Sequence, residues 1–588
     1  MSTATSTSSK ATGFENAVEQ PTPVDLVLHG DFPPWLSGVL YRTGPGTYNI
    51  PSTGDPSKVT EIHHWFDGVA MHHRFEILPA TPERGPRVVY RSHKGAPDLE
   101  QRIADAGEYP KALFAFAQRH RAADPCANLF QKFFTTFASL GEVLKAMSGR
   151  DGEHDDETTD NVSVTLTPDM PGVFTGEEEK ATSGEARKGP KVIVAKTDAN
   201  VLQLLEPSTL APLKCITYEN IDPRLSGQLS AAHACRDAET GDFYNFVAEV
   251  SAKTTYKIFK IRGDDGKVDV LANIAEKEAP PSYIHAITMT DRFVVLCVWQ
   301  AHIKQFGLSL VLTHNIADAI DKTWHPEKPS IFYVVDRHDG GLVAKYKTDA
   351  FYAFHYINAF DDPDTGDVVI DISVYPDTSV IDRLYLDTLR NPGVLENPWM
   401  GQARRYRLTD PTKATAPGKS KTPVLYAKTD FTLPQSVAVE LPTLAPGKHH
   451  HTYRYTYGIT RKPTCDGPIL SDGIIKFDMR AAAEVASASR DALEGKEDEY
   501  AKFWRIPDVT PSEPIFAPRP SGTSEDDGVL LSVALDSSAE KGRGQSALIV
   551  VDAKTMQEVA RAELPNVYPF GFHGVYTPSG VGPRKNAL

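Results

Sequence analysis

Features of membrane and secreted proteins are missing from this sequence. No stretch reaches the roughly 18 consecutive apolar residues that a membrane-spanning helix needs. The first residues, MSTATSTSSKATG, carry no apolar segment of the kind found in a secretory leader. We therefore expect a protein that is neither integral to a membrane nor secreted by that route.

Cysteine is scarce and unpatterned. The 588 residues contain five cysteines, without a CxxC pair, at Cys126, Cys215, Cys235, Cys297 and Cys465. An odd number in scattered positions predicts neither a disulfide framework nor a zinc–thiolate site. We expect a reducing compartment, the cytoplasm.

An excess of basic residues is also missing. The chain has 62 Lys and Arg against 77 Asp and Glu, a formal net charge of −15. Nucleic acid is usually met by a basic stripe, so we do not expect it as a partner. The oligomeric state is not indicated.

Short apolar or alternating runs make up most of the chain, and Gly, Asp, Asn and Pro separate them. Examples are GVLYRTG, KVIVAKT, DFYNFVAEV, RFVVLCVW, DVVIDISVY and SALIVVDAK. This pattern is typical of antiparallel sheets and predicts an all-β fold with many strands. No 40-residue repeat with a GH…WD signature is visible, so the blades of a propeller would have diverged.

Three segments depart from the strand pattern. Residues 1–20 are small and polar and predict a disordered tail, followed by a single domain over 21–588. Residues 101–147 predict helix. Residues 148–190 contain the acidic run DGEHDDETTD and the segment GEEEKATSGEARKG, and predict a solvated, mobile loop.

Four histidines lie far apart in apolar or glycine-rich settings: His233 (LSAAHACRD), His285 (SYIHAIT), His355 (FYAFHYINAF) and His573 (PFGFHGVY). A buried imidazole needs a partner for each ring nitrogen, and a metal is one such partner. For one histidine alone, a backbone hydrogen bond in the core is the commoner explanation. Four in matching settings favour a metal site.

The spacing of these histidines indicates an architecture. Separations of 52, 70 and 218 residues are too long for one helix or hairpin, so distant strands must meet around a common axis. The inner strands of a β-propeller do so. Zinc usually fills a closed tetrahedron, whereas a redox metal in six-coordinate geometry keeps positions open for dioxygen, which favours Fe(2+).

Histidine ligands usually donate their second N–H to a carboxylate. Asp198 (VAKTDANVLQ), Glu440 (SVAVELPTL) and Glu513 (TPSEPIF) are acidic residues in small or apolar surroundings. Taken singly, each is as readily explained as a turn or surface carboxylate. Together they match the partners that a four-histidine site would need.

The sequence resembles the carotenoid cleavage oxygenases over nearly its whole length. The motifs that carry the resemblance are HHWFDGVAMHHRFEI, AHACRDAETGD, SYIHAITMTDRF, FHYINAFDD, VELP, SEPIF, EDDGVLLSV, ALIVVDAKTMQEVARAELP and PFGFHGVY. The resemblance implies a seven-bladed propeller with a helical cap over its top face, and Fe(2+) bound by His233, His285, His355 and His573.

The same resemblance assigns the supporting carboxylates. Asp198, Glu440 and Glu513 would support His285, His355 and His573 respectively. The family usually has glutamate at the first of these positions. Because aspartate is one methylene shorter, either the strand moves inward or a water bridges the gap.

Enzymes of this family use dioxygen as co-substrate to split a conjugated double bond into two carbonyls, and we expect the same activity here. The aromatic residues Phe66, Tyr283, Phe354 and Phe572 are candidates for the wall of the substrate tunnel, with core packing as an equal alternative. Trp65 and Trp324 are weaker candidates.

An apolar stripe at helical spacing lies within ADPCANLFQKFFTTFASLGEVLKAM and is flanked by Lys132 and Lys145. Its members are Leu129, Phe130, Phe133, Phe134 and Phe137. Such a stripe is typical of an interfacial helix, although an ordinary packed helix is the alternative. It also resembles the membrane-binding patch of the family's isomerases, where a cysteine at the position of Cys126 can be lipidated. We expect peripheral membrane contact.

The substrate is indicated by resemblance alone. The segments FENAVEQPTPVDLVLHGDFPPWLSG, GPGTYNIPSTG and EIHHWFDG look most like the fungal oxygenases that cleave torulene to β-apo-4′-carotenal, the precursor of neurosporaxanthin. Retinal-forming cleavage of β-carotene and stilbene cleavage are the alternatives within the family. A calcium-dependent propeller hydrolase and a non-catalytic propeller platform are the rivals from other classes.

Overall fold

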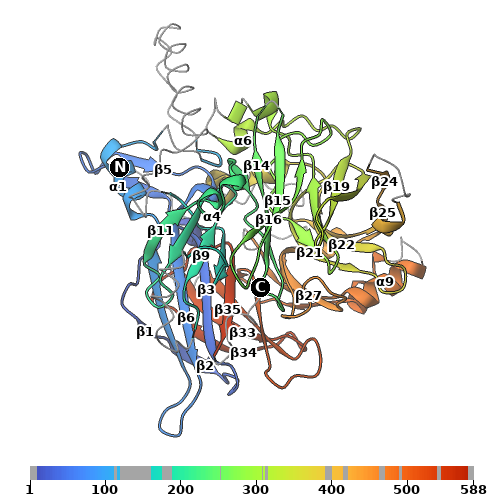
Figure 1. Ribbon diagram of the computed structural model, residues 1–588. Helices are drawn as coiled ribbons and strands as arrows, with labels where there is room; N and C mark the ends of the chain where they lie inside the picture. Colours follow the sequence, from blue (N-terminus) through green and yellow to red (C-terminus); the bar gives the residue numbers. More distant parts are fainter. Residues whose placement is uncertain are drawn as a thin grey trace.

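The computed structural model describes residues 9–110, 115–118, 160–174, 189–251, 253–307, 309–310, 315–390, 400–414, 422–462, 470–488, 493–538 and 544–579. The described residues form a seven-bladed β-propeller (Figure 1), as predicted. Strands such as β18 (Phe293–Val298) and β22 (Val368–Tyr375) are buried along their whole length. Each blade packs between two neighbours, so the apolar runs of the sequence are covered on both faces.

The first three blades follow one another along the chain, and most of their strands pair antiparallel with the preceding strand. The first is β1 (Val24–Asp25), β7 (Arg87–Lys94), β6 (Val69–Leu78), β3 (Gly38–Thr47) and β35 (Gly574–Pro578). The second is β11 (Pro212–Ile216), β10 (Leu202–Leu205), β9 (Ile193–Lys196) and β8 (Thr165–Pro168). The third is β12 (Leu229–Ser230), β13 (Cys235–Arg236), β14 (Phe243–Glu249), β15 (Thr255–Ile261) and β16 (Val268–Ile274).

The other four blades complete the ring. The fourth is β17 (Thr288–Met289), β18, β19 (Ser330–Asp336), β20 (Leu342–Thr348) and β24 (Val424–Tyr426), and the fifth is β21 (Tyr352–Asp361), β22, β23 (Gln402–Leu408) and β25 (Lys428–Thr432). The sixth is β26 (Glu440–Thr443), β27 (Tyr455–Thr460), β28 (Gly473–Asp478) and β29 (Ala501–Trp504). The seventh is β30 (Val509–Pro511), β31 (Ile515–Pro518), β32 (Gly528–Asp536), β33 (Gln545–Asp552), β34 (Glu558–Glu563) and β2 (Val27–Gly30).

Both ends of the chain close the ring. The C-terminal strand β35 pairs with β3 in the first blade, with Gly38 opposite Pro578. The N-terminal strand β2 pairs with β34 in the seventh blade, with Val27 opposite Glu563. Strands from both ends of the chain therefore complete the first and the seventh blade, which closes the ring.

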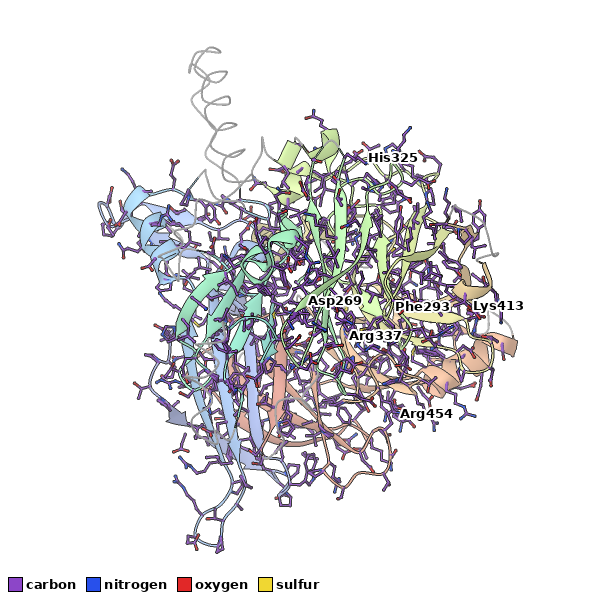
Figure 2. The ribbon with its side chains drawn as sticks, in the orientation of Figure 1. Asp269, Phe293, His325, Arg337, Lys413 and Arg454 are labelled. Carbon is purple, nitrogen blue, oxygen red and sulfur yellow. The ribbon has the colours of Figure 1, made fainter. Side chains whose placement is uncertain are left out.

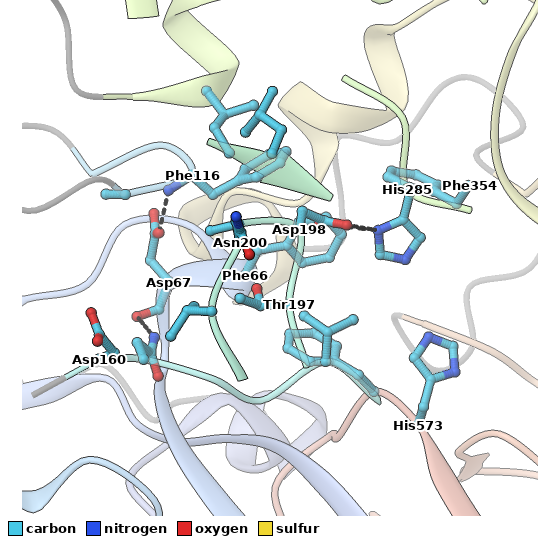
Figure 3. A pocket seen from close by; sticks show the side chains of 18 of the residues that line it. Phe66, Asp67, Phe116, Asp160, Thr197, Asp198, Asn200, His285, Phe354 and His573 are labelled. Carbon is cyan, nitrogen blue, oxygen red and sulfur yellow. Dashed lines mark hydrogen bonds and ion pairs between the residues drawn. The ribbon is translucent and has the colours of Figure 1, made fainter. Parts of the chain in front are cut away.

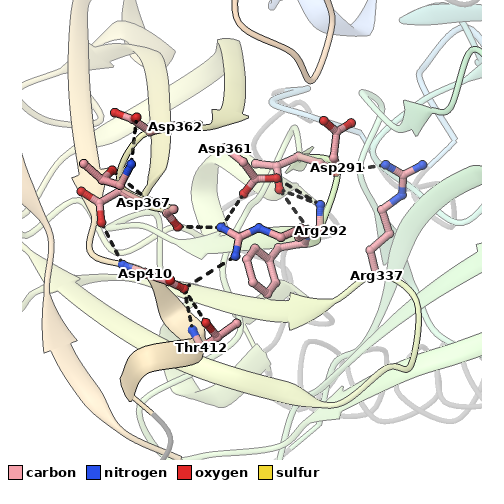
Figure 4. A network of polar contacts seen from close by, with 12 residues as sticks. Asp291, Arg292, Arg337, Asp361, Asp362, Asp367, Asp410 and Thr412 are labelled. Carbon is pink, nitrogen blue, oxygen red and sulfur yellow. Dashed lines mark hydrogen bonds and ion pairs between the residues drawn. The ribbon is translucent and has the colours of Figure 1, made fainter.

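A short turn recurs between blade strands, in place of the missing GH…WD repeat. In DAETGD, DPDTGD and DAKTMQ the first Asp accepts hydrogen bonds from the two backbone N–H groups that follow at positions three and four. The fifth residue has positive φ, 77° at Gly241, 75° at Gly366 and 60° at Met556. Arg292 joins one such turn to its surroundings by ion pairs with Asp361 and Asp410 (Figure 4). The repeat is therefore a hairpin turn rather than a blade signature.

The helices among the described residues are short and lie mostly at one end of the propeller, together with the small sheet of β4 (Asn49–Pro51) and β5 (Val59–Glu61) (Figure 1). They are α1 (Pro97–Ala106), α4 (Tyr218–Ile221), α6 (Ile316–Ala319), α7 (Ser379–Arg383) and α8 (Leu386–Arg390), with α9 (Met479–Ala488) on the sixth blade. Polar side chains such as His325, Lys413 and Arg454 lie near the outline of the molecule (Figure 2). None of the described helices is long and apolar enough to cross a membrane.

The predicted helix over 101–147 is corrected where the structure describes it. Helix α1 ends at Ala106, and Gly107 closes it with φ 66° and a bond from its N–H to the carbonyl of Ile103. Residues 115–118 are not helical, and Ala115 instead forms a bridge with Asn315. Glycine tolerates the left-handed conformation that ends a helix, which explains the early stop. Residues 119–147 lie outside the described residues.

Two further expectations are corrected. Within the predicted disordered tail, residues 9–14 form a 3-10 helix, and Phe14 is fully buried with its ring 5.0 Å from that of Phe570. Apolar contact orders this part of the tail. The predicted mobile loop over 148–190 contains strand β8, which is buried and pairs with β9. Residues 148–159 and 175–188 lie outside the described residues.

Candidate functional site

The four histidines lie where inner strands of four blades pass the propeller axis. His233 precedes β13, His285 precedes β17, His355 lies in β21 and His573 directly precedes β35. Neighbouring inner strands contact one another around the axis, as β17 does with β21 and β35 with β8. The ring closure therefore brings together side chains that are hundreds of residues apart in the chain.

The ring nitrogens of the four histidines converge on one point. One ligand atom from each lies within 4.8 Å of the others, and His355, His285 and His573 are buried while His233 is half-buried. The Nε2 atoms of His233 and His573 are 3.0 Å apart. The Nε2 atom of His355 is buried without a hydrogen-bond partner among the described residues. A buried orphan nitrogen beside three other imidazoles fits a metal ion.

Each of three histidines hydrogen-bonds a carboxylate through its other nitrogen. The distances are 2.8 Å from His285 Nδ1 to Asp198 Oδ1, 2.6 Å from His355 Nδ1 to Glu440 Oε2 and 2.7 Å from His573 Nδ1 to Glu513 Oε1. Because a carboxylate accepts, Nδ1 carries the proton and Nε2 keeps its lone pair for a metal. The pairing is the one that the resemblance implied.

Asp198 reaches its histidine directly. Its two oxygens lie 2.8 and 3.0 Å from His285 Nδ1, so no bridging water is needed. The residue lies in the loop after β9, where its backbone carbonyl accepts the N–H of Ser230 at 2.9 Å. This bond ties the loop to the third blade and offsets the shorter side chain.

Each carboxylate also has a second partner that the sequence did not predict. The hydroxyl of Tyr283 donates to Asp198 at 2.8 Å, and that of Tyr375 donates to Glu440 at 2.6 Å. The fully buried Arg42 forms an ion pair with Glu513 at 3.4 Å and donates to its backbone carbonyl at 2.8 Å. An arginine inside the apolar run GVLYRTG was the one available signal for this role.

Burial sets the charge state around the histidines. It lowers the pKa of His355 to about 4, and it holds the pKa of His233 and His573 well below the usual range. These three imidazoles are therefore neutral at pH 7, the form that binds a metal. Burial also raises the pKa of Glu513 to about 7, and the charge of Arg42 opposes this rise.

A cavity of about 710 Å³ opens beside the histidines. His285, His355 and His573 border it, and so do residues under the helical end of the propeller, such as Ile316 and Val380. Figure 3 shows Phe66, Phe116, His285 and His573 around this space. We call it the substrate cavity, because its volume and the mainly apolar side chains in its wall suit an apolar ligand.

Three of the four predicted tunnel aromatics line the substrate cavity. Phe66, Phe354 and Phe572 lie in its wall, as does Trp65. Tyr283 does not line it, because its ring packs on Phe116 and its hydroxyl is held by Asp198. Phe116 takes a place in the wall that the sequence did not predict. Trp324 is not among the lining residues, and the predicted membrane stripe over residues 129–137 lies outside the described residues.

Removal of the tyrosine hydroxyls is expected to affect metal binding through the carboxylates. Tyr283→Phe and Tyr375→Phe should each weaken metal binding by up to about tenfold, below the 10–100-fold range for direct partners of metal ligands. Titration of the iron-free protein with Fe(2+) measures the effect. Tyr256→Phe is the matched control, since this buried hydroxyl donates to the carbonyl of Pro280. An effect as large in the control would contradict the role of the tyrosines.

Comparison with known proteins agrees with this geometry. Residues 13–578 match the family described as retinal pigment epithelial membrane protein, RPE65. A carotenoid dioxygenase of Neurospora crassa is 33% identical over 96% of this chain and 90% of its own length. A torulene dioxygenase of Gibberella fujikuroi is 31% identical over 96% of this chain and 93% of its own.

Solved structures agree on the fold. A variant of the Synechocystis apocarotenoid oxygenase has a TM-score of 0.68 and 21% identity, with 97% of this chain and 98% of that chain covered. The cobalt-substituted form of the same oxygenase has a TM-score of 0.66. A family match over almost the whole chain, with relatives above 30% identity, shows that this chain belongs to the RPE65 family, the family of carotenoid cleavage dioxygenases.

Proposed function

We propose that the protein is an iron(II) dioxygenase that cleaves a conjugated double bond of torulene to give an apocarotenal. The observation that carries this proposal is the convergence of four imidazoles beside a cavity with a largely apolar wall. His233, His285, His355 and His573 would hold the iron. Asp198, Glu440 and Glu513 would orient three of them.

The donor set supports iron over the metals of the rival classes. All four ligand atoms are imidazole nitrogens, whereas calcium prefers six to eight oxygen ligands. Imidazole nitrogen suits divalent iron, so these four histidines would hold that metal. When bound, iron would supply the redox chemistry that adds both atoms of dioxygen across the double bond. The products are two carbonyl compounds, and no other reductant is consumed.

The protein's own residues would select and hold the polyene. Phe66, Phe354 and Phe572 form a continuous set of rings, with centroids 5.8 Å apart for Phe66–Phe354 and 5.5 Å apart for Phe66–Phe572. Such faces stabilise positive charge that develops in a polyene. The apolar side chains beside the histidines would also limit the access of water to the reacting bond.

Torulene is supported by the relatives. The torulene dioxygenase of Gibberella fujikuroi matches at 31% identity, whereas the human β,β-carotene 15,15′-dioxygenase matches at 25%. The test incubates iron-loaded protein with torulene, β-carotene and resveratrol, and identifies the aldehydes. We expect an apocarotenal from torulene at the highest kcat/KM. If retinal from β-carotene is the main product, torulene is the wrong substrate, whereas the proposed reaction class stands.

Metal analysis tests the reaction class itself. One iron per chain is expected in the active protein. Calcium with hydrolase activity, or full folding without any metal-dependent activity, would contradict the proposal.

Membrane access follows from a lipophilic substrate and stays a prediction. We expect the triple variant Phe133→Ser, Phe134→Ser, Phe137→Ser to lose liposome binding, because each ring contributes about 1.5–3 kcal/mol when it leaves water. Activity on torulene in lipid should fall far more than activity in detergent. Unchanged liposome flotation would show that these rings form a packing surface. Cys126→Ser tests lipidation separately.

A further inference from the structure

A second cavity, of about 320 Å³, touches the histidine centre from the other side. His233, His355 and His573 border it, so it shares two histidines with the substrate cavity. The inner strands pass through the centre between the two spaces. Near His355, Phe354 lines the substrate cavity and Ile357 lines the second cavity. Near His573, Phe572 lines the substrate cavity and Val575 lines the second cavity. We call this second space the axial cavity.

The axial cavity suits a small apolar molecule. It has less than half the volume of the substrate cavity. Most of its wall is apolar, and includes Leu166, Ile287, Ile357, Leu444, Phe516 and Val575. A polyene cleaved beside the histidines would occupy the substrate cavity, which leaves the axial cavity free.

A third cavity, of about 300 Å³, continues toward the end of the propeller and carries charge in its wall. Arg236, Asp237, Asp291 and Arg337 line this outer space, and Figure 4 shows Asp291 and Arg337 near the polar network of the neighbouring turns. We call it the rim cavity. Its charged wall favours water over apolar ligands.

Among the residues that line both the axial and the rim cavity are His449 and His450. The backbone of His450 is in the left-handed conformation, with φ 69°. Its N–H donates to Asn358 Oδ1 at 2.9 Å, and its Nδ1 is hydrogen-bonded to the carbonyl of Met289 at 3.1 Å. Burial lowers the pKa of His449 to about 4, so its ring is uncharged at pH 7. We call this pair of neutral rings the septum.

We propose that dioxygen reaches the histidine centre through the axial cavity and crosses the septum of His449 and His450 to enter it. This inference rests on the proposed dioxygenase function. Dioxygen is small and apolar, so it partitions into the apolar axial cavity, whereas a carotenoid is excluded by size. Separate entry lets the second substrate arrive while the polyene fills the other side.

Steady-state kinetics with each substrate varied in turn test the route. His449→Trp narrows the septum and is expected to lower kcat/KM for dioxygen by about tenfold while leaving kcat/KM for the polyene and the iron content unchanged. His449→Ala, which widens the septum, should not lower it. His451→Ala is the matched control, because His451 lines the rim cavity and not the axial cavity.

Xenon provides a readout that needs no turnover, since it occupies apolar cavities open to small molecules. Crystals under xenon pressure are expected to show an atom in the axial cavity. An unchanged kcat/KM for dioxygen in His449→Trp, an equal fall for both substrates, or xenon confined to the substrate cavity would overturn the route. If the unaltered iron-loaded protein cleaves no carotenoid, the proposed function fails first, which separates the two failures.

Discussion

Alanine in place of any one of His233, His285, His355 or His573 is expected to abolish bound iron and carotenoid cleavage. The four ligand atoms lie within 4.8 Å of one another, and each imidazole comes from a different blade, so no neighbouring side chain can take its place. The sheet core should stay folded, because the histidines surround the axis and the main apolar packing lies between the blades. Iron per chain, turnover and circular dichroism measure the three outcomes.

His72→Ala is the control for the loss of a buried histidine. His72 lies in β6, is fully buried, and bonds Thr43 Oγ1 at 3.0 Å and Gln203 Oε1 at 3.3 Å. This variant should lower the free energy of unfolding and keep its iron, because the ring lies outside the centre. If any of the four alanine variants keeps its full iron content and turnover, the replaced histidine is not a metal ligand.

The histidine centre was predictable because each of the four histidines is a polar residue within an apolar or glycine-rich segment. His355 lies in an apolar strand and His573 lies between Phe572 and Gly574, and in both settings a polar ring would otherwise be unsatisfied. The separations then required distant strands to meet. The sequence could not show which strands close the ring, since the pairing of β35 with β3 joins residues more than 500 positions apart.

The sequence predictions that the structure contradicts failed for reasons that can be traced to particular residues. Gly107 ends α1 within a segment whose composition favours helix. Phe14 is buried against Phe570, a contact between distant residues that the local sequence around Phe14 does not predict. Tyr283 was placed in the tunnel wall because it precedes a ligand by two residues. In the irregular segment before β17 strict alternation does not hold, and its hydroxyl turns to Asp198 instead.

The partners of the carboxylates could be read only from the structure. Tyr375 lies on β22, a strand that is buried throughout, where a tyrosine is unremarkable from sequence. Its bond to Glu440 joins neighbouring blades, and Arg42 reaches Glu513 across 471 residues. Contacts between blades depend on the closed ring, which local patterns do not encode.

Loss of charge on the carboxylates is expected to produce the second largest effect. Glu440→Gln and Glu513→Gln should weaken iron affinity by roughly 10–100-fold, the range for partners that orient metal ligands. An amide is a weaker acceptor for the Nδ1–H group and can turn its NH₂ toward it. The histidine then loses its fixed orientation, so iron titration and turnover should fall together.

Asp198→Asn is expected to weaken iron affinity by the same factor of roughly 10–100, because Asp198 contacts His285 directly at 2.8 Å. A water-bridged contact would predict a clearly smaller loss than at Glu440 and Glu513. Asp67→Asn is the matched control. This buried carboxylate also lines the substrate cavity, but it accepts the N–H groups of Phe116 and Ala117 and no histidine. Iron affinity that drops equally in the control, or that is unchanged in all three centre variants, would show that the carboxylates do not act through the histidines.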